Sequence, residues 1–440
     1  MANFLSIDET IIEDIKVITT LNNVIIYIIL KRKECSCPNC SSLKVELKEY
    51  KIKRFNHSFF LGKETTFFHK YRRFRCLKCG KTFSETSPFT PKKGKESFET
   101  IRLILDYARS YTRTWKDIAK LAHTSDTTAI NIFDRYVNPP RGNLSRVICI
   151  DECYNKHQFS KAYSAVFFNF LDRKLLDVID GRDKGNLIRY FSKISKEERY
   201  NVEYIVTDMW ESYLDVASIL FPHAIVAIDS FHVIKEIGSA LDLVRRRIMR
   251  RYKKGTKEYY LLKKWHKVIY NVQDPFDKKQ KVKGYDNKWL NAYDIQQLIL
   301  KLDDELAYAQ HYYMLYRYHN EHSSKEEFTK RIEMFIGDSN IIKIEEFIPI
   351  VNMLSNWKPW ILNSFIKVDG IRLSNGPIEG FNSFFKRLLY VSNGISTYQR
   401  FRNRLMFCYN KIDHISRATP FKKPKRGKRG PYKKSSNPKK

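Results

Sequence analysis

The sequence lacks the apolar segments that export or membrane insertion requires. Its first residues, MANFLSIDET, contain no basic region followed by an apolar run and so do not match a signal peptide. The apolar stretch Leu21–Leu30 is too short to span a bilayer and is typical of a β-strand. We therefore expect a cytoplasmic protein without a membrane partner.

Acidic residues are scarce relative to basic ones. The 440 residues include 48 Asp and Glu against 80 Lys and Arg, a net charge of +32. Such an excess is typical of proteins that bind a polyanion, because Lys and Arg release counterions condensed on phosphates. A ribosomal or membrane-surface protein would have a similar charge, but the aromatic content of 14% favours nucleic acid. The hydrophobic fraction of 43% predicts a globular chain, and the length of 440 residues predicts two or three domains.

Cysteine is also infrequent, with eight residues, and a cytoplasmic location argues against disulfides. Four of the cysteines form two Cys-x-x-Cys pairs: Cys37, Cys40, Cys76 and Cys79. Four thiolates close a tetrahedral zinc site, which makes the site structural, and a β-hairpin would fill the interval between the pairs. We predict a zinc ribbon over residues 1–92, with Cys35 outside the ligand set. The alternative is four unrelated buried thiols.

Residues 93–140 are predicted to be helical. Apolar residues recur at helical spacing in the first segment: Ile101, Leu105 and Ala108. The next segment, TWKDIAKLAHTSDTTAINIFDRYV, predicts a helix, a turn and a second helix. The expected caps are Thr114 for the first helix and Ser125 or Asp126 for the second. The residues expected to face inward are Ile118, Ala119 and Leu121.

This spacing fits a helix-turn-helix DNA-binding domain. Its recognition face would carry Thr127, Thr128, Asn131 and Arg135. A plain helical hairpin is the alternative, and the basic charge and the zinc ribbon favour DNA binding. The segment Asn138–Gly142 contains two prolines and a glycine, which marks a domain boundary.

From Arg146 onward the pattern changes to β-strands. Three strands in succession are followed by alternating helix and strand, which predicts an α/β domain around one mixed sheet. Three strands end on carboxylates, at Asp151, Asp208 and Asp229. Open α/β sheets place their ligands at the carboxyl ends of strands, although an Asp there also commonly caps the next helix.

A fourth carboxylate, Glu379, begins a helix that is otherwise rich in Asn, aromatic and basic residues. The charge of Asp151, directly after the apolar run Val147–Ile150, is costly unless a partner compensates it. Asp151, Asp208 and Glu379 together would bind two Mg²⁺ or Mn²⁺ ions, which prefer carboxylate and phosphate oxygens. Two such ions are typical of phosphoryl-transfer sites on nucleic acid.

Six motifs occur in order along the chain: CPNC, RCLKCG, CIDE, VTDMW, AIDSFHV and SNGPIEGFNSFFKR. In this order they resemble the insertion-sequence L-three (ISL3) family of bacterial DDE transposases. The resemblance implies a multidomain α+β fold with an RNase H-like catalytic domain at residues 141–420, interrupted by a helical insertion at about 235–368. It places the DDE triad on Asp151, Asp208 and Glu379.

The resemblance also implies partners and location. We expect the protein to bind double-stranded DNA, both the terminal inverted repeats of an insertion sequence and the target. It would act as a homodimer or a higher synaptic complex at the bacterial nucleoid. Two alternatives stay open: a catalytically decayed DNA-binding regulator, and an RNase H-like nuclease without joining activity.

Several further residues have two interpretations each. Asp229 and His232 would form an auxiliary metal or DNA site, or else a helix cap and a packed side chain. Asn382 would contact DNA or orient a carboxylate, and Lys386 and Arg387 would contact phosphates or form a solvated face. Residues 421–440, basic and without apolar periodicity, predict a disordered arm that adds non-specific DNA affinity.

Overall fold

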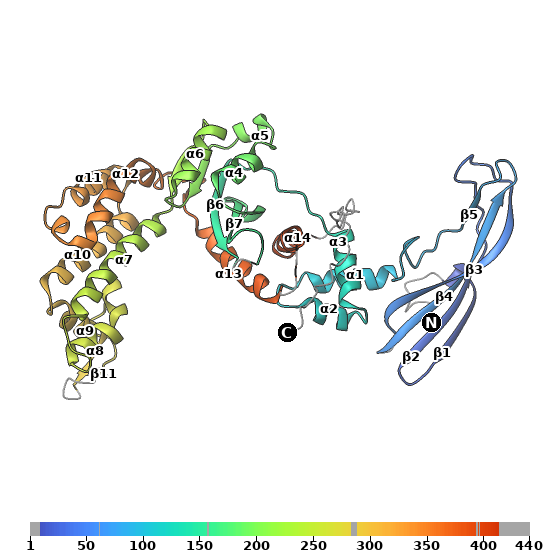
Figure 1. Ribbon diagram of the computed structural model, residues 1–440, viewed down its shortest axis with the longest axis horizontal. Helices are drawn as coiled ribbons and strands as arrows, with labels where there is room; N and C mark the ends of the chain where they lie inside the picture. The colour runs from blue at the N-terminus through green and yellow to red at the C-terminus, as the bar shows by residue number, and fades with distance from the viewer. Residues whose placement is uncertain are drawn as a thin grey trace, which may run out of the picture. The chain divides into compact units, whose positions relative to one another are not determined.

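A computed structural model describes residues 9–60, 62–155, 158–282, 288–392, 395 and 397–412. The chain divides into two compact units. Figure 1 labels the helices and strands along the chain. One contains Met1–Pro140 and Phe384–Lys440, and the other contains Arg141–Ser383. One point of division falls within the segment Asn138–Gly142, and the other falls between Ser383 and Phe384, inside the helix Gly376–Val391. The predicted basic arm at 421–440 lies outside the described residues.

The first unit begins with a β-sheet whose strand order is β1-β2-β4-β3, with β5 paired to β4. After a short 3-10 helix, Glu9–Ile11, the strands are β1 (Ile12–Thr19), β2 (Asn23–Leu30), β3 (Val45–Phe60), β4 (Lys63–Cys76) and β5 (Thr82–Ser84). Alternate residues of β2, such as Val24, Ile26 and Ile28, are buried against Phe55 and Phe67. The antiparallel hairpin β3–β4 fills the interval between the two cysteine pairs, as predicted.

The same unit contains the α-helices α1 (Phe98–Ala108), α2 (Trp115–Leu121), α3 (Asp126–Tyr136) and α14 (Tyr398–Tyr409), together with the last turns of α13 (Gly376–Val391). The caps at Thr114 and Ser125 are confirmed, because each side-chain oxygen accepts a backbone N–H three residues on. The prediction that Leu121 faces inward is wrong. Leu121 is 38% exposed at the last position of α2, and Ala122 occupies the buried site instead.

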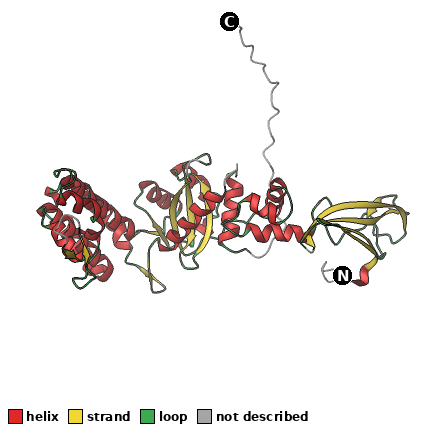
Figure 2. Cartoon of the chain, turned by 90° about the horizontal axis from the view of Figure 1, so that it is seen from below, coloured by secondary structure: helices red, strands yellow, loops and turns green. Residues whose placement is uncertain are grey.

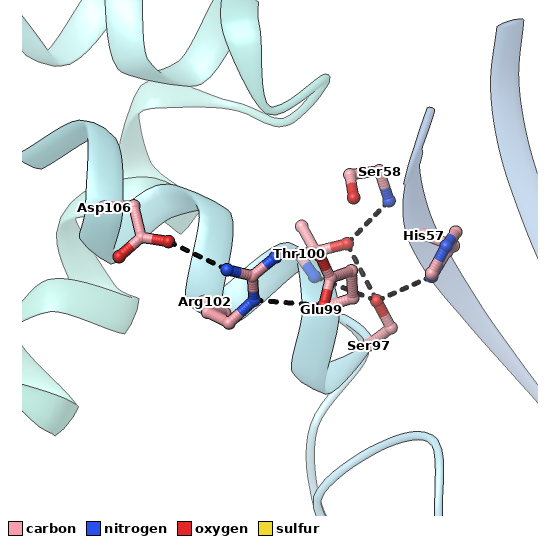
Figure 3. Close-up of polar contacts among 7 residues, drawn as sticks. All are labelled: His57, Ser58, Ser97, Glu99, Thr100, Arg102 and Asp106. Atoms are coloured by element: carbon pink, nitrogen blue, oxygen red, sulfur yellow. Dashed lines mark hydrogen bonds and ion pairs between the residues drawn. The ribbon is translucent and has the colours of Figure 1, made fainter. Parts of the chain in front are cut away.

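A polar network joins the end of β3 to the start of α1 (Figure 3). The Ser97 hydroxyl caps α1 by accepting from the Thr100 N–H at 3.0 Å, and it lies 3.0 Å from His57 Nδ1. The Thr100 hydroxyl in turn accepts from the Ser58 N–H at 2.7 Å. Since these groups are buried or half-buried, their mutual hydrogen bonds tie the first helix to the sheet.

The second unit is built around a five-stranded mixed sheet with strand order β10-β9-β6-β7-β8. Its strands are β6 (Val147–Tyr154), β7 (Tyr163–Asn169), β8 (Lys174–Asp180), β9 (Tyr204–Thr207) and β10 (Ile225–Ile228). β6, β7 and β8 form an antiparallel meander, and β9 and β10 run parallel to β6. The predicted mixed α/β sheet is therefore confirmed. Helices α4 (Lys184–Phe191), α5 (Lys196–Tyr200) and α6 (Glu211–Leu220) connect the strands.

The two faces of this sheet have different neighbours. Ile148 and Ile150 point into a core shared with residues of α4 and α6. Asp151 and Cys153 point to the opposite face, because successive strand residues alternate. Helix α13 (Gly376–Val391) packs on that face, where the rings of Phe168 and Phe381 are 6.0 Å apart.

Between β10 and α13 the chain is almost wholly helical (Figure 2). The α-helices are α7 (Ser230–Met249), α8 (Lys257–Lys264), α9 (Ala292–Leu300), α10 (Asp304–His322), α11 (Lys325–Ile336) and α12 (Ile348–Asn363). Short 3-10 helices lie at His266–Tyr270, Ile341–Lys343 and Glu345–Phe347, and short strands are β11 (Gln280–Lys281), β12 (Trp289–Leu290), β13 (Lys367–Val368) and β14 (Ile371–Arg372). These helices share one apolar core. In the described part of the chain, no helix is both long and apolar enough to cross a bilayer.

Candidate functional site

Three carboxylates gather at one edge of the sheet in the second unit. β6 and β9 are parallel with Ile150 opposite Thr207, so Asp151 and Asp208 follow at the same level. β10 is parallel to β9 with Ile228 opposite Thr207, which brings Asp229 to the same edge. Neighbouring parallel strands thus place their carboxyl-end residues together.

The ligand atoms of these residues form two overlapping clusters. Oxygens of Asp151, Glu152 and Asp208 lie within 4.8 Å of one another, and so do atoms of Asp208, Asp229 and His232. His232, in the first turn of α7, has its Nδ1 2.9 Å from Asp208 Oδ2. Asp208 belongs to both clusters and is therefore their common member.

Burial and mutual repulsion perturb the titration of this site. Burial, followed by the charge of Asp208, raises the pKa of Asp151 to about 7. Burial also raises the pKa of Asp229, whose Oδ2 is buried without a hydrogen-bond partner among the described residues. Burial lowers the pKa of His232, but its hydrogen bond to Asp208 and the charges of the aspartates outweigh this effect and raise it. A divalent cation fits a site with this excess of close, buried carboxylate oxygens.

Asn375 connects the aspartates from the loop before α13. Its backbone N–H donates to Asp229 Oδ1 at 3.0 Å, and its Nδ2 lies 3.3 Å from Asp208 Oδ1 and 3.4 Å from the Ile150 carbonyl oxygen. The side chain is 1% exposed. Asn375 is therefore hydrogen-bonded to both Asp208 and Asp229.

Asn382, on α13 two turns beyond Asn375, holds Asp151. Its Nδ2 donates to Asp151 Oδ2 at 2.9 Å, and its Oδ1 accepts from the Cys153 thiol at 2.7 Å. Both amide ends are therefore engaged within the site. Of the two roles predicted for Asn382, these contacts favour orientation of a carboxylate over a contact with DNA.

Glu379 lies between Asn375 and Asn382 in the first turn of α13. It is exposed, and its charge contributes to the raised pKa of Asp229. Among the described residues it belongs to neither cluster of close ligand atoms. Its role as a third metal ligand stays a prediction, and so do the roles of Lys386 and Arg387, which are exposed on the same helix.

Glu152 was not among the predicted site residues. Its carboxylate forms an ion pair with Arg182 and accepts a hydrogen bond from the Tyr213 hydroxyl at 2.9 Å. The Arg182 guanidinium lies 4.2 Å from the ring centroid of Tyr163 and 4.7 Å from that of Trp210. The only signal in the sequence was the adjacency of Glu152 to Asp151, which does not distinguish a site residue from a surface acid.

The part of the chain that contains these carboxylates matches a known protein family. The model of a family described as Transposase, of the ISL3 type, matches residues 148–405. This range is more than half of the 440 residues. The chain belongs to the ISL3 transposase family. No curated protein matches it.

The N-terminal part of this transposase-family chain contains the four paired cysteines. Their ligand atoms lie within 4.8 Å of one another, and the sulfurs of Cys37 and Cys79, like those of Cys40 and Cys76, are 3.6 Å apart. A tetrahedron with Zn–S bonds of about 2.3 Å has sulfurs about 3.8 Å apart, so the cluster fits zinc. Burial raises the pKa of Cys37, but backbone N–H groups and the neighbouring thiols outweigh it and lower the pKa to about 6. For Cys40 a backbone contact lowers the pKa, but burial and the neighbouring thiols outweigh it and raise the pKa.

The predicted recognition face lies on α3 of the same unit. Thr127, Asn131 and Arg135 are exposed and recur at four-residue intervals, so they share one side of the helix. Thr128 is half-buried, and its hydroxyl lies 2.9 Å from the Ser125 hydroxyl at the cap. The helix pair is present, and its use in DNA binding stays a prediction.

Proposed function

We propose that this member of the transposase family binds the terminal inverted repeats of an insertion sequence and catalyses metal-dependent cleavage and joining of DNA strands. The observation that carries the proposal is the convergence of Asp151 and Asp208 at adjacent strand ends, held by amide donors from Asn382 and Asn375. The sheet order β10-β9-β6-β7-β8 with α13 across one face supports an RNase H-like catalytic domain.

Asp151 and Asp208 would hold Mg²⁺ or Mn²⁺, and Glu379 would complete the set from α13. The bound ions would activate the attacking oxygen and stabilise the leaving oxygen of an in-line displacement. In the first step a water oxygen bonds to the phosphorus and the bond to the 3′ oxygen breaks, which leaves a 3′-hydroxyl and a 5′-phosphate. In the second step that 3′-hydroxyl attacks a phosphodiester of the target DNA, and a target 3′ oxygen departs.

Asp229 and His232 would act as an auxiliary pair in this site. His232 shares its proton with Asp208 through the 2.9 Å contact, which fixes the direction of that carboxylate. Asp229 occupies the N-cap position of α7, yet its side chain makes no capping hydrogen bond. Its Oδ1 instead accepts from Asn375 N–H. These contacts favour a positioning role over a simple helix cap.

Recognition of the element ends would use the zinc ribbon together with a helix-turn-helix formed by α2 and α3. Thr127, Thr128, Asn131 and Arg135 would face base edges in the major groove. Because two element ends must be paired, the active form would be a homodimer or a larger synaptic complex.

The test is a cleavage and strand-transfer assay on DNA with a labelled 3′ end and the native inverted repeats. Asp208→Asn should abolish cleavage and leave end binding intact, because it removes a metal ligand without changing the fold. Asp369→Asn is a matched control, since its carboxylate is 61% exposed and pairs only at the surface with Arg146. Unchanged cleavage by Asp208→Asn would overturn the assignment. Cut product without joined product would identify a nuclease, and end binding without cleavage by the wild type would identify a regulator.

A further inference from the structure

A groove with a cavity volume of about 820 Å³ runs along α7 in the helical insertion. One wall consists of α7 residues three or four positions apart, among them Phe231, Lys235, Asp242 and Arg246. The other wall contains Lys263 of α8, Tyr313 of α10, and His266 and Tyr270 of the 3-10 helix His266–Tyr270. The spacing on α7 shows that a single face of this helix forms the groove.

The lining of this groove, which we call the α7 groove, is basic. Its lysines and arginines are Lys235, Arg245, Arg246 and Lys263, against one carboxylate, Asp242. That carboxylate lies 2.6 Å from both Arg245 and Arg246, so its charge is compensated within the wall. Lys235, Arg246 and Lys263 are exposed. The α7 groove therefore presents net positive charge to solvent and favours an anionic occupant.

Exposed apolar side chains accompany these cations. Phe231 is 52% exposed and Leu243 is 51% exposed, and both line the groove. The floor is closed by the rings of Tyr270 and Tyr313, which pack beside Gly238, where an added Cβ would lie 3.3 Å from the Tyr313 ring. Exposed aromatic residues next to lysine and arginine are typical of surfaces that follow a nucleic-acid strand, where bases stack and phosphates pair with cations.

The position of the groove indicates which part of a bound nucleic acid would occupy it. Phe231 lines its first turn, and the next residue, His232, contacts Asp208 in the carboxylate site. The ring centroids of Phe231 and His232 are 5.8 Å apart. A nucleic acid with one phosphate at the carboxylates therefore meets the α7 groove with its adjacent nucleotides.

We infer that the α7 groove binds the DNA segment directly next to the phosphate that reacts at Asp151 and Asp208. This inference rests on the proposed function of the carboxylate site. Lys235, Arg246 and Lys263 contact the phosphates of the segment, and Phe231 contacts the base or sugar nearest the reacting phosphate. The helical insertion thus contributes a substrate-binding surface to the catalytic domain. An acidic peptide has the right charge for the groove but nothing to place at the carboxylates.

The experiment uses the full chain with the double substitution Lys235→Ala and Lys263→Ala. Removing two phosphate contacts should lower DNA affinity about 10-fold near 0.1 M salt and reduce the slope of log K against log salt by about 1.5–2. The readout is DNA affinity and its salt dependence, because neither lysine belongs to the carboxylate clusters. The matched control is Lys253→Ala with Lys254→Ala, which removes the same charge from exposed positions outside the groove.

A second substitution tests the aromatic contact. Phe231→Ala should raise the fluorescence of a 2-aminopurine placed beside the reacting phosphate, because unstacking relieves quenching, while the salt slope stays at the wild-type value. The inference is overturned if the wild type cleaves but the lysine double variant binds DNA like its control. It is also overturned if the double variant loses self-association instead of DNA affinity, which would make the groove a contact between copies of the chain. If the wild type does not cleave DNA but its DNA affinity still depends on Lys235 and Lys263, only the proposed function is contradicted.

Discussion

Asn382 donates a hydrogen bond from its Nδ2 to Asp151 Oδ2 at 2.9 Å, and the two residues are 231 positions apart in sequence. The same amide accepts from the Cys153 thiol through Oδ1. Since Asp151 is 6% exposed, its carboxylate has few other donors available, and the orientation of its oxygens depends on α13. The helix that carries Glu379 therefore also positions a carboxylate of the sheet.

Replacement of Asn382 by Ala should weaken metal binding about 10- to 100-fold, because a hydrogen bond to a ligand carboxylate orients that ligand towards the metal. The measurement is a Mg²⁺ titration of cleavage together with the Mn²⁺-dependent shift of the unfolding temperature, which does not require activity. Ser383→Ala, at the exposed neighbouring position, is the control. An unchanged metal dependence in Asn382→Ala would show that Asp151 is oriented without the amide.

Substitution of Cys76 by Ser should remove bound zinc and unfold the region around the two cysteine pairs, because metal binding and folding are coupled at small structural sites. The measurement is the zinc content of purified protein by elemental analysis, with end-DNA binding as a second readout. Cys35→Ser is the control, since this cysteine precedes Cys37 by two residues but is outside the four. Equal zinc content in the two variants would contradict a four-thiolate site.

Substitution of Arg400 by Ala should destabilise the first unit by about 3 kcal/mol. The Arg400 guanidinium pairs with both oxygens of Asp134 on α3, at 2.8 and 2.7 Å, and both side chains are less than 15% exposed. Removal of the arginine leaves a shielded carboxylate without its partner. Calorimetric unfolding measures the effect, and the double variant with Asp134→Ala should be less destabilised than Arg400→Ala alone. Additive effects would show that the ion pair contributes no coupling.

Substitution of His69 by Phe should remove an acid sensitivity of the N-terminal sheet. Burial lowers the pKa of His69 to about 4, below the value of about 6.5 in the unfolded chain. Neither ring nitrogen has a hydrogen-bond partner in the part of the chain that the structure describes. The stability from the neutral ring is present above pH 6.5 and is lost as the pH falls towards 4, by about 2 kcal/mol at pH 5. Calorimetry at pH 7.5 and 5 should show a smaller decrease for His69→Phe. His311→Phe, an exposed position on α10, should behave like the wild type.

Local patterns in the sequence were sufficient to predict features that depend on residues close together in the chain. The caps at Thr114 and Ser125 follow from side-chain oxygens placed three residues before a free backbone N–H. The cysteine spacing predicted a cluster that the hairpin β3–β4 closes. The strand pattern also indicated the mixed sheet with carboxylates at strand ends. Leu121 was misassigned because helical periodicity alone does not show where the last turn of a helix meets solvent.

Tertiary structure alone decided which acids meet and which amides hold them. The sequence determined that Asp151 and Asp208 end apolar strands, but only the parallel register of β6 and β9 brings them to one level. The hydrogen bonds from Asn375 to Asp208 and from Asn382 to Asp151 each join residues more than 160 positions apart, and they depend on the packing of α13. The position of Glu379 outside both clusters depends on the same packing. Periodicity and spacing encode contacts a few residues apart. Contacts across a helical insertion depend on how separate elements pack, and that information is distributed over the whole core.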